Sequence, residues 1–92
     1  MLQEDRSKLS NKTQDMKRAI DSLNEEMWAI DAYIQRADAC TDKDLKEILL
    51  YNSKDEKEHA AMLIEWIRRN DTELDHELHA TLFKKGGITG QN

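Results

Sequence analysis

DEKEH, at residues 55–59, is the stretch from which the fold of this 92-residue chain can be worked out. If successive residues are turned by about 100°, as in an α-helix, a row of apolar residues falls within roughly 50° of one direction. The row consists of Leu45, Ile48, Leu49, Leu63, Trp66 and Ile67. Glu56 and His59 fall inside the same row. A charged group on a buried face is costly unless it is paired or bound to a cation, so these two residues indicate a metal site.

The spacing of Glu56 and His59 suits a metal ion. Residues three apart on a helix lie one turn apart on the same face. They can therefore offer an oxygen and a nitrogen to one ion. The alternative interpretation is that both residues are ordinary polar interruptions of a helical scaffold.

Two long helices are predicted around this stretch. The first covers residues 13–39, with apolar positions at alternating spacings of four and three, as in a bundle helix. These positions are Met16, Ile20, Leu23, Met27, Ile30, Ile34 and Ala37. The period then breaks, and Thr41 or Asp42 can cap a second helix over residues 42–70.

The ends of the chain are predicted to be less regular. Residues 1–12 are polar without a period and are expected to form a flexible arm. A capping box of Asn70 and Glu73 opens a shorter third helix over residues 71–85. Two glycines follow it, and residues 86–92 are expected to form a flexible tail. Residues 1–92 therefore form one all-α domain, in keeping with the absence of proline and a charged fraction of 36%.

A short turn between two long helices predicts an antiparallel hairpin. Glu26 and Glu56 are equally distant from position 41 in that turn, so their carboxylates are expected at the same height. Tyr33 lies two turns beyond Glu26 along the same edge of the first helix. The hairpin thus brings Glu26, Glu56 and His59 together, with Tyr33 within reach.

This set is half of the ligand set of a di-metal carboxylate bundle, in which two helices each supply a Glu and two others each supply a Glu-x-x-His. The predicted fold is therefore an antiparallel two-helix hairpin plus a short C-terminal helix, with a four-helix ferritin-like bundle completed by a two-fold dimer. Four carboxylates then balance two divalent ions. The chemistry open to such a site is iron oxidation, di-manganese or peroxide-reducing chemistry, or structural metal binding in a non-enzymatic scaffold that holds Zn(II).

Composition limits the partners. A net charge of -5 argues against nucleic acid and against an anionic membrane surface, and no apolar run is long enough to span a bilayer. Cys40 is the only cysteine, which suits a reducing, cytoplasmic location. His76 and His79 are expected on a solvated surface. Trp28 points away from the apolar row of the first helix and is expected to mark a contact with another subunit.

Several runs of this sequence resemble the encapsulated ferritins, over about residues 16–88. The most distinctive are EKEHAAM at 56–62 and EWIRRND at 65–71, supported by LNEE at 23–26 and DAYIQR at 31–36. The resemblance implies a ferroxidase whose dimer builds a di-iron site and whose dimers close into a decameric ring. It implies iron ligands at Glu26, Glu56 and His59, with Tyr33 beside them; Zn, Co or Mn can substitute for iron.

The resemblance also implies a partner and a location. Such proteins oxidise Fe(II) inside an encapsulin nanocompartment, whose shell holds the iron for storage. Two positions depart from the family pattern: Trp28 replaces an acidic residue of an outer metal-uptake site, and Ala32 replaces a tryptophan. The tail at residues 86–92 contains no convincing targeting peptide.

Overall fold

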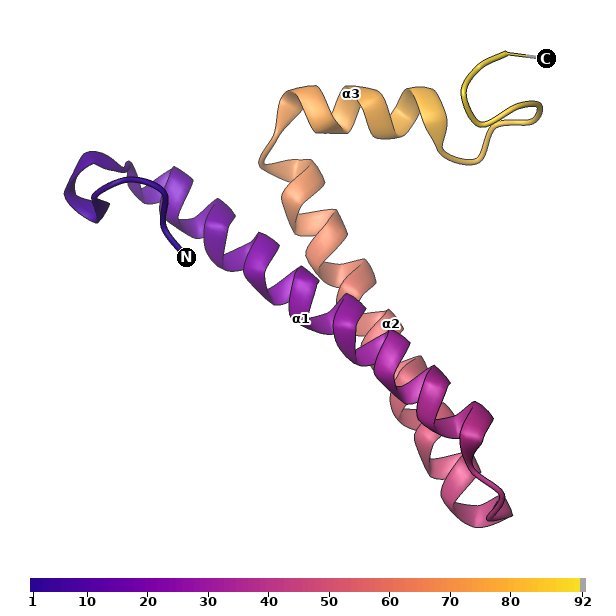
Figure 1. The fold of residues 1–92 in the computed structure, drawn as a ribbon. Helices are drawn as coiled ribbons and strands as arrows, with labels where there is room; N and C mark the ends of the chain where they lie inside the picture. The colour runs from indigo at the N-terminus through magenta and orange to yellow at the C-terminus, as the bar shows by residue number, and fades with distance from the viewer. Residues whose placement is uncertain (92) are drawn as a thin grey trace.

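Three α-helices and one 3₁₀ turn make up the chain in the computed structural model, which describes residues 1–91 (Figure 1). In chain order these are η1 (Arg6–Lys8), α1 (Asn11–Ala39), α2 (Lys43–Arg69) and α3 (Thr72–Thr81). The helices α1 and α2 run antiparallel along one another, and α3 leaves the far end of α2 at a wide angle. The predicted all-α hairpin with a short third helix is confirmed.

Side-chain caps explain where the two long helices begin. The Ser10 hydroxyl accepts a hydrogen bond from the Thr13 backbone N–H at 3.1 Å, so α1 begins at Asn11, two residues before the predicted start. The carboxylate of Asp42 accepts from the N–H of Leu45 at 2.9 Å and caps α2, so of the two predicted candidates Asp42, and not Thr41, is the cap. The connection between the helices is therefore short, which keeps them antiparallel neighbours.

The predicted cap of α3 is wrong by one residue. Asp71, and not Asn70, accepts a hydrogen bond from the N–H of Leu74, at 2.9 Å. Asn70 instead ends α2, because its side-chain amide donates to the Trp66 carbonyl at 2.8 Å. That amide is thus engaged with the preceding helix and does not cap the following one.

The outer segments also differ from the predicted ranges. The third helix ends at Thr81, short of the predicted residue 85, because Leu82 is extended with a ψ of 146° and Phe83 takes a φ of 58°. Neither conformation continues a right-handed helix. The first residues were expected to be a flexible arm. They contain η1, where the Asp5 carboxylate accepts from the Ser7 N–H at 2.9 Å.

The interface between α1 and α2 is built from small residues. Ala19 and Ala37 of α1 are buried, as are Ser53, Ala60 and Ile67 of α2, which follow one another at intervals of seven residues. Small side chains in a heptad row allow two helices to approach closely. They also remove little apolar surface from water, so the hairpin alone has a minimal core.

Six of the thirteen predicted apolar positions are left exposed by the hairpin. On α1 the face toward α2 is centred on Ala19 and Ala37, which rotates part of the predicted row into solvent. We call this part the second apolar face; its residues are 42–53% exposed and are Ile20, Met27 and Ile34. On α2, the first apolar face consists of residues that are 39–56% exposed, namely Leu45, Ile48 and Trp66.

The two apolar faces lie on opposite sides of the hairpin. On α1, turning about 100° per residue moves from Ala19 to Ile20 in the positive sense. On α2, the same count of about 100° per residue places Leu45 on the negative side of the buried row that contains Ser53. Because the helices are antiparallel, displacements of opposite sign project to opposite sides. One partner packed against one face therefore leaves the other face exposed.

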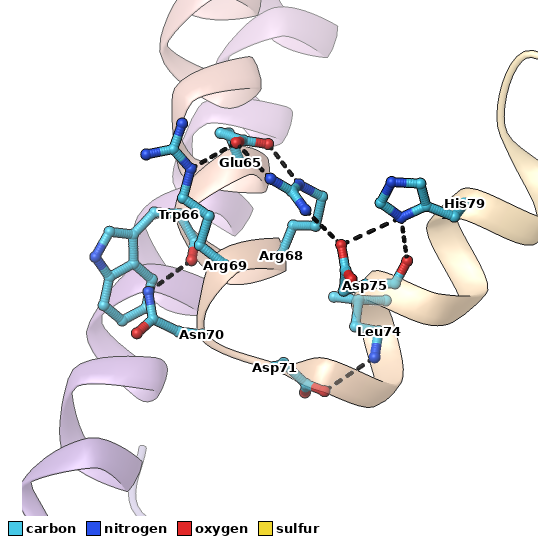
Figure 2. A network of polar contacts seen from close by, with 9 residues as sticks. All are labelled: Glu65, Trp66, Arg68, Arg69, Asn70, Asp71, Leu74, Asp75 and His79. Carbon is cyan, nitrogen blue, oxygen red and sulfur yellow. Dashed lines mark hydrogen bonds and ion pairs between the residues drawn. The ribbon is translucent and has the colours of Figure 1, made fainter.

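A polar network fixes the direction of α3 (Figure 2). Arg68 of α2 donates hydrogen bonds to Glu65 on its own helix, at 2.7 and 2.8 Å, and to Asp75 on α3. Arg69 adds a second contact to Glu65 at 2.6 Å, and His79 lies 3.2 Å from Asp75. These hydrogen bonds lower the pKa of Glu65 to about 2. No side chain of α3 is fully buried, so the Arg68–Asp75 contact is a main link between α3 and α2, beside the half-buried Leu78.

Candidate metal centre

Glu26 enters the site from the middle of α1. It lies near the line of Ala19 and Ala37, and this position directs it toward α2 rather than into solvent. Its side chain is 23% exposed, and its Oε2 atom is buried without a hydrogen-bond partner. A buried carboxylate oxygen without a partner is costly, which indicates that a ligand normally completes it.

Glu56 and His59 enter from α2, one turn apart. The Nδ1 atom of His59 lies 3.4 Å from Oε2 of Glu56. Glu56 is 23% exposed and His59 48% exposed, so His59 is the outermost of the three residues. The helical spacing of three residues, already visible in the sequence, produces this contact within a single helix.

The three side chains converge across the hairpin. His59 Nδ1 lies 3.7 Å from Oε2 of Glu26, and one donor atom from each of the three residues lies within 4.8 Å of the others. Both contacts of His59 are longer than an N–H···O hydrogen bond of about 2.9 Å. The potential metal-binding atoms of the three side chains thus lie close together without hydrogen bonds between them.

This donor set fits a divalent transition-metal ion. Two ligands that each lie about 2.1 Å from one ion are separated by roughly 3 Å, and small side-chain adjustments close the observed gaps to that value. Two carboxylates and one imidazole suit iron, manganese, cobalt or zinc. Three protein donors leave coordination positions open for a substrate or for further ligands. The hairpin therefore supplies an incomplete centre.

The centre lies at the margin of the first apolar face. His59 is displaced from the buried line of α2 to the same side as Leu45 and Trp66. Beside Glu26 and Glu56, a shallow hollow of about 570 Å³ is also lined by Asn24, Glu25, Trp28 and Ala29. The centre is thus flanked by exposed apolar residues and reached by a hollow that carries an additional carboxylate, Glu25.

Tyr33 is on the same side of α1 as Glu26 but is not part of the three-residue cluster. It is half-buried and two helical turns away, which corresponds to roughly 10 Å along the axis. The guanidinium of Arg36 lies 5.6 Å from the centre of its ring. Arg36 was not among the predicted site residues, although its spacing of three residues from Tyr33 on the helix indicates this contact. A role for Tyr33 at the metal centre remains a prediction.

The other residues considered from the sequence lie elsewhere. Trp28 is 67% exposed on the outer surface of α1. His76 is exposed on α3, and Nδ1 of His79 donates to the Asp75 carbonyl, 2.9 Å away. Cys40 is half-buried in the turn, with its Sγ 3.5 Å from the Asp42 carbonyl. Within residues 1–91, one group of three or more His, Cys, Asp or Glu residues is arranged so that it could hold an ion. It consists of Glu26, Glu56 and His59.

Comparison with known proteins places this geometry in a family. The sequence profile of the family described as EncFtn-like matches residues 1–85. An encapsulated ferritin-like protein of Rhodospirillum rubrum is 49% identical over 81 residues, which cover 88% of this chain and 58% of that protein. A ferritin-like protein of Thermotoga maritima is 43% identical over 83 residues, covering 90% of this chain and 73% of that protein.

The fold comparison agrees. The crystal structure of protein NE0167 from Nitrosomonas europaea superimposes with a TM-score of 0.91 at 54% sequence identity, over 95% of this chain and 96% of that one. Among the described helices, none is both long and apolar enough to cross a membrane. The chain spans a little over half of the R. rubrum relative, so what that whole protein does carries over only as a proposal.

Proposed function

Since this chain belongs to the EncFtn-like family, whose fold is half of a dimeric ferritin-like bundle, we propose that it is a ferroxidase. It oxidises Fe(II) to Fe(III) at a di-iron site that two subunits share. The observation that carries this proposal is the convergence of Glu26, Glu56 and His59 within 4.8 Å. These are the three residues from which the sequence predicted a metal site.

A second copy is needed because the hairpin supplies only half of the ligands. A two-fold axis beside His59 presents Glu26, Glu56 and His59 twice, which gives four carboxylates and two imidazoles for two ions. The same contact covers the exposed first apolar face of both copies, at Leu45, Ile48 and Trp66. Completion of the site and burial of apolar surface thus favour the same dimer.

Charge supports occupancy by two divalent ions. Four carboxylates held close together repel one another, and the half-buried position of Glu26 and Glu56 strengthens this repulsion by limiting solvent. Two Fe(II) ions bring the charge of the site close to neutral. Metal binding is therefore expected to hold the dimer together.

The residues of the chain then favour oxidation of the bound iron. Carboxylate oxygens are hard ligands that stabilise Fe(III) relative to Fe(II), which lowers the reduction potential. Each iron gives up one electron, and molecular oxygen accepts the electrons under aerobic conditions. Glu56 would be the residue that reaches both ions, since it lies nearest the centre of the apolar row of α2. Glu26 and His59 are terminal ligands that fix the two ions in place.

We place the protein in the cytoplasm, inside an encapsulin nanocompartment that stores the oxidised iron. The name of the R. rubrum relative, an encapsulated ferritin-like protein, supports this partner. Assembly beyond the dimer is supported by the second apolar face at Ile20, Met27 and Ile34, which one two-fold contact leaves uncovered. Two different contacts on opposite faces generate a closed ring of dimers, and a decamer is our proposal for its size.

Aerobic Fe(II) oxidation tests the function. Metal-free protein is mixed with Fe(II), and the ferric absorbance is followed in wild type, Glu56→Ala and the control Glu58→Ala. Glu58 is exposed on the same helix and outside the cluster, so both variants lose one charge but only one loses a ligand. We expect wild-type oxidation to exceed the buffer rate, Glu58→Ala to match wild type, and Glu56→Ala to be ~10-fold slower or more.

The alternatives give other results. A structural metal scaffold binds Zn(II) or Co(II) but oxidises Fe(II) at the buffer rate in all three proteins. A di-manganese or peroxide-reducing protein consumes peroxide with Mn(II) and leaves Fe(II) oxidation at the buffer rate. Thermal melts without metal accompany the assay. Glu56→Ala is expected to melt no lower than wild type, because removing one of several close carboxylates relieves repulsion.

A further inference from the structure

Arg36 contacts an aromatic ring, whereas Arg18, Arg68 and Arg69 contact carboxylates. Its guanidinium lies 5.6 Å from the centre of the Tyr33 ring, within the range of a cation–π contact. Although the chain carries 19 acidic residues, no carboxylate of residues 1–91 pairs with Arg36.

The local sequence explains this contact. On a helix, a side chain meets those three and four residues away. For Arg36 these neighbours are Ala32, Tyr33, Ala39 and Cys40, none of which is acidic. Tyr33 is the one neighbour that attracts a guanidinium. Arg36 also lies in the last turn of α1, where the helix dipole favours a cation, so the guanidinium is held near that end of the helix.

The contact is on the side of the hairpin that carries the metal centre. Counted at about 100° per residue, Glu26, Tyr33 and Arg36 are all displaced from the buried line of α1 in the same sense as Glu56 and His59 from that of α2. Tyr33 is half-buried, whereas Arg36 is exposed and covers the ring from outside. In the proposed two-fold dimer, the two Tyr33 rings therefore flank the shared site along the helix axes.

We propose that Arg36 is a positioning residue for Tyr33, and that it holds the phenol ring on the side of the hairpin that carries the metal centre. This inference rests on the proposed function for its catalytic consequence. The stacked guanidinium restricts the ring to one orientation and shields one ring face from water. A cation–π contact at an exposed site changes the ratio between this ring orientation and the alternative orientations by about two- to five-fold.

The ring can be observed directly, because the chain has only two tyrosines. Protein labelled with 3-fluorotyrosine gives two ¹⁹F NMR signals, and Tyr51→Phe assigns them. Tyr51 is 65% exposed and serves as the internal reference. Co(II) is added as a paramagnetic probe of the distance between the metal centre and each ring. The variants are Arg36→Gln, Arg36→Lys and the control Arg18→Gln, which removes an exposed guanidinium from the opposite end of α1.

We expect Arg36→Gln to move the Tyr33 signal toward that of Tyr51 and to change its relaxation by Co(II) at least two-fold. Arg36→Lys retains the cation, so its Tyr33 signal position and relaxation by Co(II) are expected to lie between those of wild type and Arg36→Gln. Arg18→Gln is expected to leave both quantities at their wild-type values. Iron oxidation is expected to slow about two- to five-fold in Arg36→Gln while Co(II) affinity is unchanged. A Tyr33 signal and relaxation unaffected by Arg36→Gln would overturn the proposal.

The two proposals fail in different ways. If the Tyr33 signal responds as expected but wild type oxidises no Fe(II), the ferroxidase assignment is lost and Arg36 still positions the ring. If wild type oxidises Fe(II) and Arg36→Gln does so at the same rate, the metal centre stands and Arg36 has no positioning role in the reaction.

Discussion

Nδ1 of His59 lies 3.7 Å from Oε2 of Glu26, which joins the second long helix to the first at mid-length. This contact exists because the short turn at Cys40–Asp42 keeps α1 and α2 in antiparallel register. It also places a buried carboxylate oxygen that has no hydrogen-bond partner beside an imidazole that is nearly half exposed. The candidate metal centre is therefore open on the side that a second copy can cover.

Metal is expected to drive dimerisation. Adding Fe(II), Co(II) or Zn(II) to metal-free protein supplies the ion that joins two sets of Glu26, Glu56 and His59, so dimers and larger species are expected to increase. Sedimentation velocity with and without metal measures this, and EDTA is expected to reverse it. A monomer under both conditions contradicts a site shared between subunits.

The two tryptophans are expected to act on different contacts. Trp28 is exposed on the outer surface of α1, at the rim of the hollow beside Glu26, whereas Trp66 belongs to the first apolar face. Removing a buried aromatic anchor costs about 2 kcal/mol or more. Trp28→Ala is therefore expected to reduce the ring to dimers that still oxidise iron, and Trp66→Ala to weaken the dimer and its activity. Mass photometry at micromolar concentration distinguishes them; an intact ring in Trp28→Ala would place Trp28 on the open surface.

The attachment of α3 is expected to weaken at low pH. The folded protein holds the pKa of Glu65 at about 2, below its ordinary value of 4.5, because Arg68 and Arg69 donate hydrogen bonds to the carboxylate. A lowered pKa stabilises the folded state fully above about pH 4.5, and this contribution is lost as the pH falls from there toward 2. Amide hydrogen exchange in α3 is expected to accelerate across that window while the exchange of α1 changes less.

Arg68→Gln is the matching variant for the α3 attachment at neutral pH. It removes the contacts to both Glu65 and Asp75, whereas the control Arg69→Gln removes only a contact within α2. Faster exchange in α3 is expected for Arg68→Gln alone. Equal exchange in the two variants would show that the apolar residues of α3 hold it without the ion pair.

Ser53 is expected to cost stability. It is 2% exposed, in a heptad row with Ala60 and Ile67, and its hydroxyl has no hydrogen-bond partner. A buried unsatisfied hydroxyl costs about 1–3 kcal/mol, so Ser53→Ala is expected to raise the free energy of unfolding by about 1 kcal/mol. Ala60→Ser, one heptad further, is the control and is expected to lower it. Urea denaturation measures both; a destabilised Ser53→Ala would mean that the hydroxyl has a partner in the assembled protein.

The sequence by itself determined the helices and most of the metal centre. Asp42 is a local cap, and the Glu56–His59 contact follows from helical spacing, so both could be predicted from near neighbours. The meeting of Glu26 with Glu56 could be predicted because a short turn fixes the register of an antiparallel pair. The spacing of Glu26, Glu56 and His59 was therefore enough to predict that these three side chains meet.

Only the tertiary structure decided which part of each apolar row is covered. The row of the first helix combines residues that pack against α2 with Ile20, Met27 and Ile34, which remain exposed. Both kinds are apolar because both avoid water in an assembled protein, so a periodicity does not separate a contact within the chain from a contact with another subunit. The direction of α3 was likewise undetermined, because the Arg68–Asp75 ion pair that sets it joins two helices across a bend and has no helical spacing to reveal it.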